Sequence, residues 1–539
     1  MRIKSRILRP VAGAFLLGAV LAGCQDLNVP NTNAPDRIRA LSSAADVETL
    51  VASSWRDHWG RVHNSGSTVN VLPLVADEKS GTYANNAALE LSSEPRPPLN
   101  NVATADAHAL GRFQWEDWYK AISSVNDGLG AIANGLIIST GEEGEEAVDN
   151  TIRTKAFAKW MQAIGHGYLS ILFDQAFVVD EDTDLEFIDE IPLLPYQEVR
   201  DAAIGLMQEA INIMATSSFT TPTSWIPSRS YTPQQLSRIG HSYIVRFLVY
   251  GARTPEERAA LDWNKVLQHL DQGITEDYEV DLESGVLTSA AYSRYQTTGT
   301  FSAYGDYKLI GPADVSGAFR AWLDKPLADR ERFQIVTPDR RITGPTPTSN
   351  GAYYRYYSNN IFRPERGLYH HSHYQWRRHV QQYGATTLSS TGVAKLMTVD
   401  EMNLIRAEAL IRLNRAAEAL PFINITRERP RNIAGTEYPG LPPVTVAGVP
   451  QSDDCVPRMD GVTCADLMGA LMYERMIEGA LIDIIRGYAD SRGWGRLPEG
   501  TFIHLPIPAR QLEAMNMPIY SFGGIGGPGT APCVWPFCG

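Results

Sequence analysis

The feature of this sequence that most restricts its fold is a series of apolar residues at helical spacing, which comes in adjacent pairs of segments. The clearest pair is 398–413 with 415–428, separated by Asn414 at a position where a residue with positive φ commonly ends a helix. The first segment has apolar residues on two faces, which is typical of a helix packed between neighbours. A second pair, 232–250 with 256–272, repeats this design at roughly the period of a tetratricopeptide unit.

Helical hairpins of this kind bury their apolar faces only when they stack on one another. We therefore predict a mainly α fold with a tetratricopeptide-like helical-repeat body; an ordinary helical domain without repeat geometry is the alternative. Strand patterns are few and short. The expected helical segments are 43–62, 105–135, 148–173, 196–215, 232–250, 256–272, 398–413, 415–428 and 464–486.

One part of the chain, about 280–395, lacks the helical pattern. It is rich in Gly, Pro, Ser and Thr and dense in aromatic residues. Loops of this length are uncommon unless they carry function, because loops held on a rigid scaffold are the usual place for binding residues. We predict a single domain over 42–539, in which 280–395 is a large, loop-rich insertion.

The N-terminus has the order of an export signal: four basic residues, an apolar run over 11–22, and Leu-Ala-Gly-Cys at 21–24. A run of about 12 apolar residues is shorter than the roughly 20 that a membrane-spanning helix needs, but it fits a signal peptide. Leu-Ala-Gly-Cys resembles the bacterial lipobox, in which the cysteine receives a diacylglyceryl group. We predict that 1–23 is a lipoprotein signal peptide, that Cys24 is the lipid attachment site, and that the Asn- and Pro-rich stretch 24–41 is a flexible tether.

The chain is acidic, with a formal net charge of −13 at pH 7. Loss of the predicted signal peptide would remove four basic and no acidic residues and lower the charge to −17. Nucleic acids bind where lysines and arginines cluster, whereas here lysines are few and arginines are scattered among acidic residues. The sequence therefore argues against a nucleic-acid partner.

Five cysteines make an odd number, and lipid attachment at Cys24 accounts for the odd one. The other four form two close pairs, Cys455 with Cys464 and Cys533 with Cys538. Such pairs usually oxidise outside the cytoplasm, so we predict two disulfides. Metal binding is the weaker alternative, because neither pair has the C-x2-C spacing that holds zinc.

Motifs that carry chemistry are weak in this chain. The glycine-rich stretch 524–529 has the spacing of a dinucleotide-binding loop but no strand before it and no helix after it. His370, His371 and His373 lie on an extended stretch where alternate side chains diverge, and the aspartates over 180–184 lack the glycine and glutamate of a calcium loop. We therefore predict no metal, no cofactor and no catalytic residue, although the paired carboxylates of a glycosidase have no fixed spacing and stay open as an alternative.

A series of segments covers nearly the whole chain after the tether: Trp115–Tyr119, Asn126, Ala156–Phe173, Asp262–Asn264, Glu401–Arg427, Tyr473–Glu478, Asp483–Arg486, Trp494–Leu497 and His504–Pro508. Together they resemble the SusD/RagB family of nutrient-binding lipoproteins, which capture glycans or peptides. Two features depart from the family pattern: Asn414 stands where a glycine is frequent, and Asp-Ile-Ile-Arg-Gly-Tyr over 483–488 replaces an Asp-Leu-Arg-Arg-Trp-like string.

The resemblance implies a surface-exposed lipoprotein of the outer membrane. It would capture an oligosaccharide or peptide without catalysis and deliver it to a TonB-dependent, SusC-like channel. Two other functions fit the same residues. An exported glycan- or peptide-active hydrolase would turn over its polymer, and a passive helical-repeat scaffold of the envelope would bind no ligand.

The insertion concentrates aromatic rings among Asn, Arg and His; these are Tyr353, Tyr354, Tyr356, Tyr357, Tyr369, Tyr374 and Trp376. Their flat faces suit sugar rings or extended peptides, and the alternative is that they cover the helical core. The resemblance implies a ligand surface built from an early loop and a late one, so we place the site on the insertion, facing the early loop of Asp77, Tyr83, Asn85 and Asn86. The predicted stacking residues are Tyr354, Tyr374 and Trp376, with Asn85 and Arg377 as hydrogen-bonding rim.

Overall fold

The structure of the chain is a computed structural model, which describes residues 41–64, 68–82, 84, 87–140, 148–184, 190–283, 286–288, 304–358, 363–366, 371–378, 392–483, 485–530 and 533–535. Cys24, the predicted signal peptide and the predicted tether up to residue 40 lie outside the described residues. In the part of the chain that is described, no helix is both long enough and apolar enough to cross a membrane.

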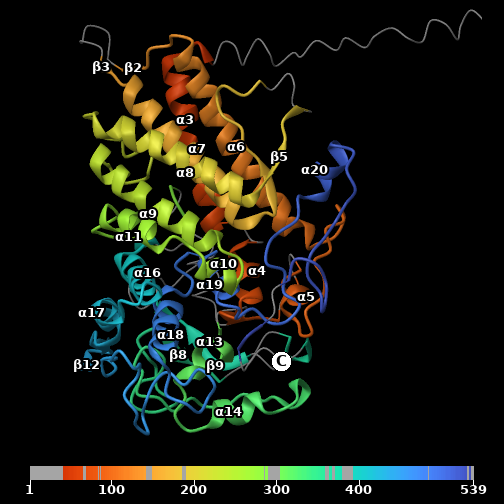
Figure 1. Cartoon of the computed structure of the whole chain (residues 1–539), viewed down its shortest axis with the longest axis vertical. Coiled ribbons are helices and arrows are strands. Elements are labelled where there is room, and N and C mark those ends of the chain that lie inside the picture. The colour runs from red at the N-terminus through yellow and green to blue at the C-terminus, as the bar shows by residue number, and fades with distance from the viewer. Residues whose placement is uncertain are drawn as a thin grey trace, which may run out of the picture.

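Helices in the first half of the chain stack in sequence order (Figure 1). They are α3 (Ala44–Trp59), α6 (His108–Ala133), α7 (Thr151–Leu172), α8 (Tyr196–Ala215), α9 (Pro233–Gly251), α10 (Pro255–Ala259) and α11 (Trp263–Asp271). α7 is buried on almost every side because α3, α6, α8 and α9 all pack against it. These stacked helices confirm the predicted mainly α, tetratricopeptide-like body.

Local sequence explains where these helices begin and how closely they pack. The side chain of Thr232 caps α9, and that of Asp262 caps α11. The cap at Asp262 starts a new helix, so the predicted helix 256–272 is divided into α10 and α11. Gly167 on α7 lies where a Cβ would come within 2.1 Å of the Phe247 ring, so only glycine allows α7 and α9 to approach this closely.

The late helical hairpin consists of α16 (Val399–Arg412) and α17 (Ala416–Arg427), as predicted. Asn414 between them has a φ of 59°, the left-handed conformation expected at the end of a helix. α18 (Leu467–Gly479) packs against both helices. The predicted helix 464–486 is shorter than expected, because the chain turns at Leu481, with a φ of 57°, before α19 (Arg486–Gly493) begins.

Short helices connect these larger elements. They are η1, a π-helix (Gly60–Asn64), α4 (Thr68–Val75), α5 (Ala88–Ser92), α13 (Tyr307–Ile310), α14 (Ala318–Leu323), α20 (Ala509–Ala514) and the 3-10 turns η4 (Gly311–Ala313), η5 (Leu327–Asp329) and η6 (Pro364–Arg366).

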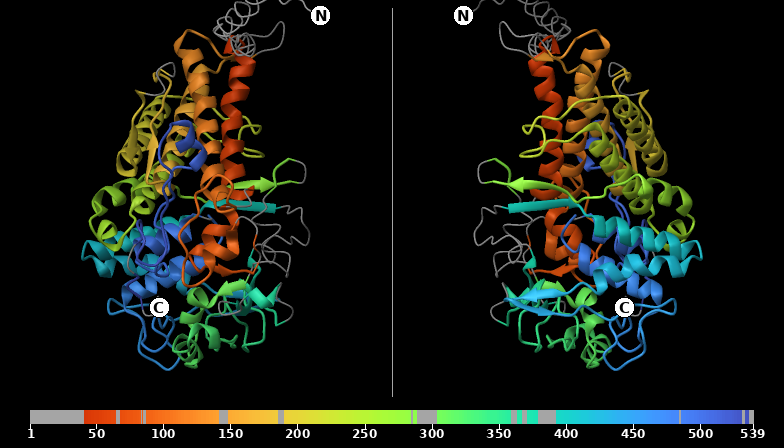
Figure 2. Two further views of the ribbon diagram at one scale, coloured as in Figure 1. Left: turned by 90° about the vertical axis from the view of Figure 1, so that its right-hand side faces the viewer. Right: turned by 90° about the vertical axis from the view of Figure 1, so that its left-hand side faces the viewer.

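Strands organise the segment predicted to be an insertion. β6 (Tyr278–Leu282) and β10 (Gly392–Met397) pair antiparallel at its two ends, and Figure 2 shows this pair projecting from the helical body. Between them lies a four-stranded sheet of order β1-β7-β9-β8, made of β1 (Lys79–Ser80), β7 (Tyr304–Asp306), β9 (His371–Trp376) and β8 (Tyr354–Tyr356). The remaining pairs are β2 (Ser139–Thr140) with β3 (Val148–Asp149), β4 (Gln175–Phe177) with β5 (Leu193–Pro195), and β11 (Arg431–Ile433) with β12 (Thr436–Tyr438).

Buried ion pairs link the helices of the late half to those of the early half. Arg246 on α9 binds Glu401 on α16 at 2.7 Å and Asp483 at 2.8 Å. Arg258 on α10 binds Glu408 on α16 at 2.7 Å. Buried charges are stable only when they are paired in this way, so the network fixes how the two halves meet.

The cysteines agree with the predicted oxidation where they are described. Cys455 and Cys464 form a disulfide with a Cα–Cα distance of 5.7 Å, as predicted. Cys533 is also disulfide-bonded, whereas Cys538, its predicted partner, lies outside the described residues.

Candidate functional site

The early and late segments that were predicted to face each other do meet. β1 pairs antiparallel with β7, so that Lys79 lies opposite Gly305 and Ser80 opposite Tyr304. The early segment is thus an edge strand of the insertion's own sheet. Tyr83, Asn85 and Asn86 lie outside the described residues.

The three rings predicted to stack on ligand lie in the protein core. Tyr354, Tyr374 and Trp376 are exposed by only 1%, 0% and 1%. The register places Tyr354 opposite Trp376, and their ring centroids are 4.9 Å apart in an edge-to-face arrangement. All three rings belong to the hydrophobic core that the insertion forms with helices α16, α17 and α18. The expectation that they stack on ligand is therefore corrected in favour of the alternative, that they cover the core.

Asp77 also has a structural role. Its carboxylate is buried and binds Arg96 at 2.7 Å and Lys308 at 3.2 Å. These ion pairs tie the early segment to helix α13, so the prediction that Asp77 contacts ligand is corrected as well.

Arg377, the predicted rim residue, belongs to the opposite face of the sheet. Because side chains alternate along a strand, His373, Gln375 and Arg377 point the same way, together with Arg355, which the register places opposite Gln375. Tyr304 is also opposite Gln375. We call this side of the sheet the arginine face and define it by Arg332, Arg355, Arg377, Tyr304, Tyr357, His373 and Gln375. Tyr304 and Gln375 are buried, with 1% and 0% exposure, and support the other five side chains, which are half-buried.

Guanidinium groups and tyrosine rings alternate on the arginine face. The Arg355 guanidinium lies 4.5 Å from the centre of the Tyr357 ring, and that of Arg332 lies 5.8 Å from the centre of the Tyr304 ring. The two rings are 6.4 Å apart. Arg355 Nε donates to Gln375 Oε1 at 2.6 Å, which fixes the orientation of its planar head. Flat rings next to fixed polar donors are the chemistry of a saccharide-binding surface.

The local electrostatics of the arginine face are positive. Burial lowers the pKa of Arg332, and burial together with the charge of Arg355 lowers the pKa of Arg377. Burial, reinforced by the charge of Arg332, lowers the pKa of His373 to about 4, so its imidazole is neutral at pH 7. The positive charge of this face therefore comes from its arginines alone.

A second surface, not foreseen from the sequence, is a groove of about 1770 Å³ along the C-terminal half of α6. Its other walls come from residues 177–193 and from the end of α20, and half-buried rings of Tyr119 and Phe177 line it. The lining includes acidic residues and no lysine or arginine. We call it the α6 groove. The residues that form its walls are up to more than 300 positions apart in the sequence, so no local sequence pattern could predict this groove.

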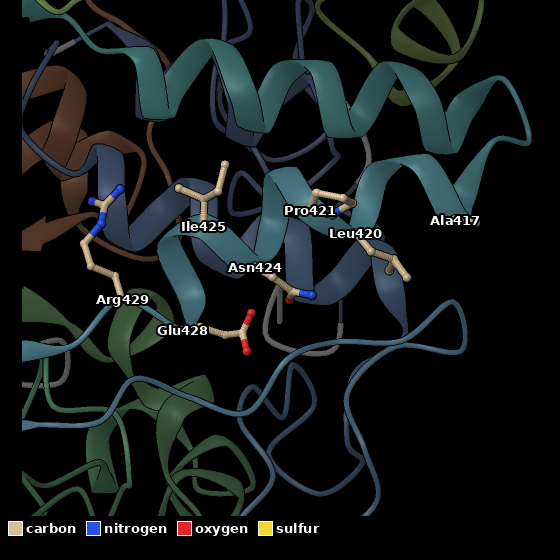
Figure 3. Close-up of a pocket in the computed structure, with 7 residues that line it drawn as sticks. All are labelled: Ala417, Leu420, Pro421, Asn424, Ile425, Glu428 and Arg429. Carbon is tan, nitrogen blue, oxygen red and sulfur yellow. The ribbon is translucent and has the colours of Figure 1, made fainter.

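Another hollow, of about 600 Å³, lies along α17 (Figure 3). It is lined by Ala417, Leu420, Pro421, Asn424, Ile425, Glu428 and Arg429. All of these residues belong to α17 or the two positions after it, so this is the outer side of a single helix with no opposing wall.

In the ranges given above, no group of three or more His, Cys, Asp or Glu side chains could hold a metal ion. His370 lies outside these ranges.

No protein-family model and no curated protein matches the chain by sequence. Solved structures match it in three dimensions. A SusD superfamily protein from Bacteroides fragilis is 14% identical, with 88% of this chain and 98% of that chain covered and a TM-score of 0.52. A SusD homolog from Parabacteroides distasonis is 12% identical, with 83% and 84% covered and a TM-score of 0.53. A SusD-like carbohydrate binding protein from Bacteroides fragilis is 15% identical, with 83% and 86% covered and a TM-score of 0.49.

The first two alignments show that this chain has the fold of the SusD superfamily. The resemblance found in the sequence is thereby confirmed at the level of the fold.

Proposed function

We propose that the protein is a surface lipoprotein that captures a polymeric nutrient, a glycan, and delivers it to a TonB-dependent outer-membrane channel without catalysing a reaction. The observation that carries the proposal is the arginine face, where the half-buried Tyr357 ring lies beside the fixed guanidinium of Arg355 on a sheet in a SusD fold. Rings of this kind stack on sugar faces, while guanidinium and amide groups bind hydroxyls.

The edge of the sheet favours a glycan over an extended peptide. Peptides commonly bind by adding a strand to an open edge. At β8, however, the N–H of Tyr354 donates to the carbonyl of Arg341, and the N–H of Tyr356 donates to the side chain of Asn350. The carbonyl of Tyr354 accepts from Gly351. These contacts occupy the outer edge of β8, so a peptide lacks the main-chain groups it would pair with at this edge, which borders the arginine face.

Binding to a panel of neutral and charged polysaccharides and of peptides tests the proposal, measured by affinity electrophoresis and isothermal titration. Tyr357→Ala should weaken binding by about 1–3 kcal/mol, the range for loss of an aromatic contact at a binding site. Met517→Glu is the matched control in the α6 groove, where Met517 is 39% exposed, and it should leave binding unchanged. If Met517→Glu lost binding and Tyr357→Ala did not, the glycan-binding site would be the α6 groove instead of the arginine face.

The same panel separates the two other functions. Release of shorter fragments from any polymer would support an exported hydrolase. Failure to bind every polymer, together with stable complexes with envelope proteins, would support a scaffold.

Delivery to a channel is a separate part of the proposal, and it rests on the SusD fold and the predicted lipid anchor. Affinity purification of the intact protein from detergent-solubilised outer membranes should bring down a TonB-dependent channel. Recovery of the intact lipoprotein without any such channel would contradict this part.

A further inference from the structure

The arginine face has a charge opposite to that of the chain as a whole. The protein carries a net charge of −13, yet residues 345–391 contain five arginines and a single carboxylate, Glu365. That carboxylate already lies 3.6 Å from Arg363. Arg378 pairs with the buried Glu478 at 3.3 Å, so the positive charge of the arginine face comes from Arg332, Arg355 and Arg377.

Arg332 and Arg355 have oxygen partners without negative charge. Arg332 donates to the carbonyls of Ser372 at 2.8 Å and Tyr357 at 3.1 Å, and Arg355 donates to the amide of Gln375. Among the described residues, neither arginine forms an ion pair, and the terminal nitrogens of Arg355 make no hydrogen bond. The remaining stretches of the insertion, 289–303, 359–362, 367–370 and 379–391, contain no Asp or Glu in their sequence.

Several buried arginines elsewhere in the protein have an internal negative counterpart. Arg246 and Arg258 face carboxylates, as described above. Arg253 and Arg492 donate to carbonyls in the last turn of α7 and at its C-cap, where the helix dipole is negative. In the described ranges, the arginine face offers neither a carboxylate nor a helix end to Arg332 and Arg355, so these residues supply no counter-charge there.

We infer that the glycan captured at the arginine face is anionic and carries carboxylate or sulfate groups on its sugar rings. This inference rests on the proposed function and names its ligand class. A sugar ring stacked on Tyr357 would bring an acidic substituent to Arg355, 4.5 Å from the same ring. A guanidinium binds carboxylate and sulfate oxygens through two parallel N–H groups, which a neutral hydroxyl cannot match.

Four polymers and a peptide test the inference: polygalacturonate for carboxylate, dextran sulfate for sulfate, galactan and dextran as neutral counterparts, and poly-glutamate as an acidic peptide. The full-length lipoprotein should bind polygalacturonate or dextran sulfate more tightly than the neutral counterpart. Binding should weaken as salt is raised, because salt screens charge interactions. Arg355→Gln should weaken it about tenfold or more, as expected for loss of a charge-assisted hydrogen bond, and Arg355→Lys should restore part of it.

Lys325→Gln is the matched control, because it removes one positive charge from an exposed position of the same insertion. It should leave affinity unchanged, and melting temperatures should show that both arginine variants fold. Equal binding of neutral and charged glycans, or equal loss in Lys325→Gln and Arg355→Gln, would overturn the inference while leaving capture intact. A preference for poly-glutamate over both charged glycans would also overturn it. Binding to no polymer of the panel would overturn the proposed function as well.

Discussion

Glu408 on α16 gives the sharpest test of how the two halves of the molecule are held together. It is fully buried, and its carboxylate accepts bonds from Arg258 at 3.0 and 2.7 Å, from Arg475 at 2.7 Å and from Trp494 Nε1 at 3.2 Å. Glu408→Gln keeps the shape of the side chain but leaves two buried guanidinium groups with Asp490 as their remaining carboxylate. Breaking a buried pair in this way costs about 3–5 kcal/mol, so we expect a loss of unfolding free energy of that size.

The pKa of Glu408 gives a similar estimate of how much this carboxylate contributes to the unfolding free energy. Burial by itself would raise this pKa, but Arg258 and Arg475 outweigh burial and lower it from 4.5 to about 2. A change of that size corresponds to about 3 kcal/mol, because each tenfold change in proton affinity is worth ~1.4 kcal/mol. Since the folded-state pKa lies below the unfolded one, the stabilisation is present above about pH 4.5 and is lost as the pH falls towards 2.

Urea unfolding at 25 °C, measured between pH 7 and pH 3, checks both expectations. The difference between the wild type and Glu408→Gln should be largest near pH 7 and should shrink below about pH 4.5, because Glu408 of the unfolded wild type takes up a proton there while the folded protein keeps it charged. Glu418→Gln is the control, since Glu418 forms an exposed pair with Arg415 and should contribute little. A variant as stable as the wild type at pH 7, or a difference that does not depend on pH, would refute the reasoning.

Three further predictions follow from burial and from the sequence. Trp376→Ala should lower the unfolding free energy by about 3–5 kcal/mol with a clear drop in melting temperature, because the ring is 1% exposed. An unchanged melting temperature would contradict the assignment of this ring to the core. Cys24→Ser should leave the protein unanchored on fractionation, and a variant that still partitions with membranes would remove the lipid attachment. Replacing Cys455 and Cys464 by serine should lower the unfolding free energy by about 2–3 kcal/mol, because a short closed loop is released, whereas thiol titration that finds both cysteines free in the unreduced protein would contradict the disulfide.

The helical hairpin 398–428 was predictable because every signal for it is local. Apolar spacing defines both helices, and Asn414 takes the left-handed conformation that ends the first. The end of α18 was not predictable, because the helical pattern continues through residue 486 while the chain turns at Leu481. There the chain folds back on itself: a Cβ on Gly479 would meet the guanidinium of Arg486, so the end of α18 packs directly against the start of α19.

The aromatic cluster of the insertion shows a different limit. Alternation along 353–357 indicates that successive side chains point to opposite faces, but it does not tell which face is buried. That choice is made by the pairing of Tyr354 with Trp376 and by the helices under the sheet, which are far away in the sequence. The sequence therefore predicted that the insertion meets the early segment, while the predicted stacking residues fell on the buried face.

The residues that revealed the fold are mostly not those that would choose a ligand. Tyr473, Glu474, Arg475 and Glu478 carry much of the C-terminal resemblance, and all four are buried in the ion-pair network of α18. A change there would cost stability, so these residues report how the helices pack rather than what the protein binds. The arginine face differs, because Arg332, Arg355, Arg377 and Tyr357 are only half-buried and can change without opening a buried charge. The ligand class that we infer for this face therefore rests on its own ring and guanidinium groups and not on the residues that reveal the fold.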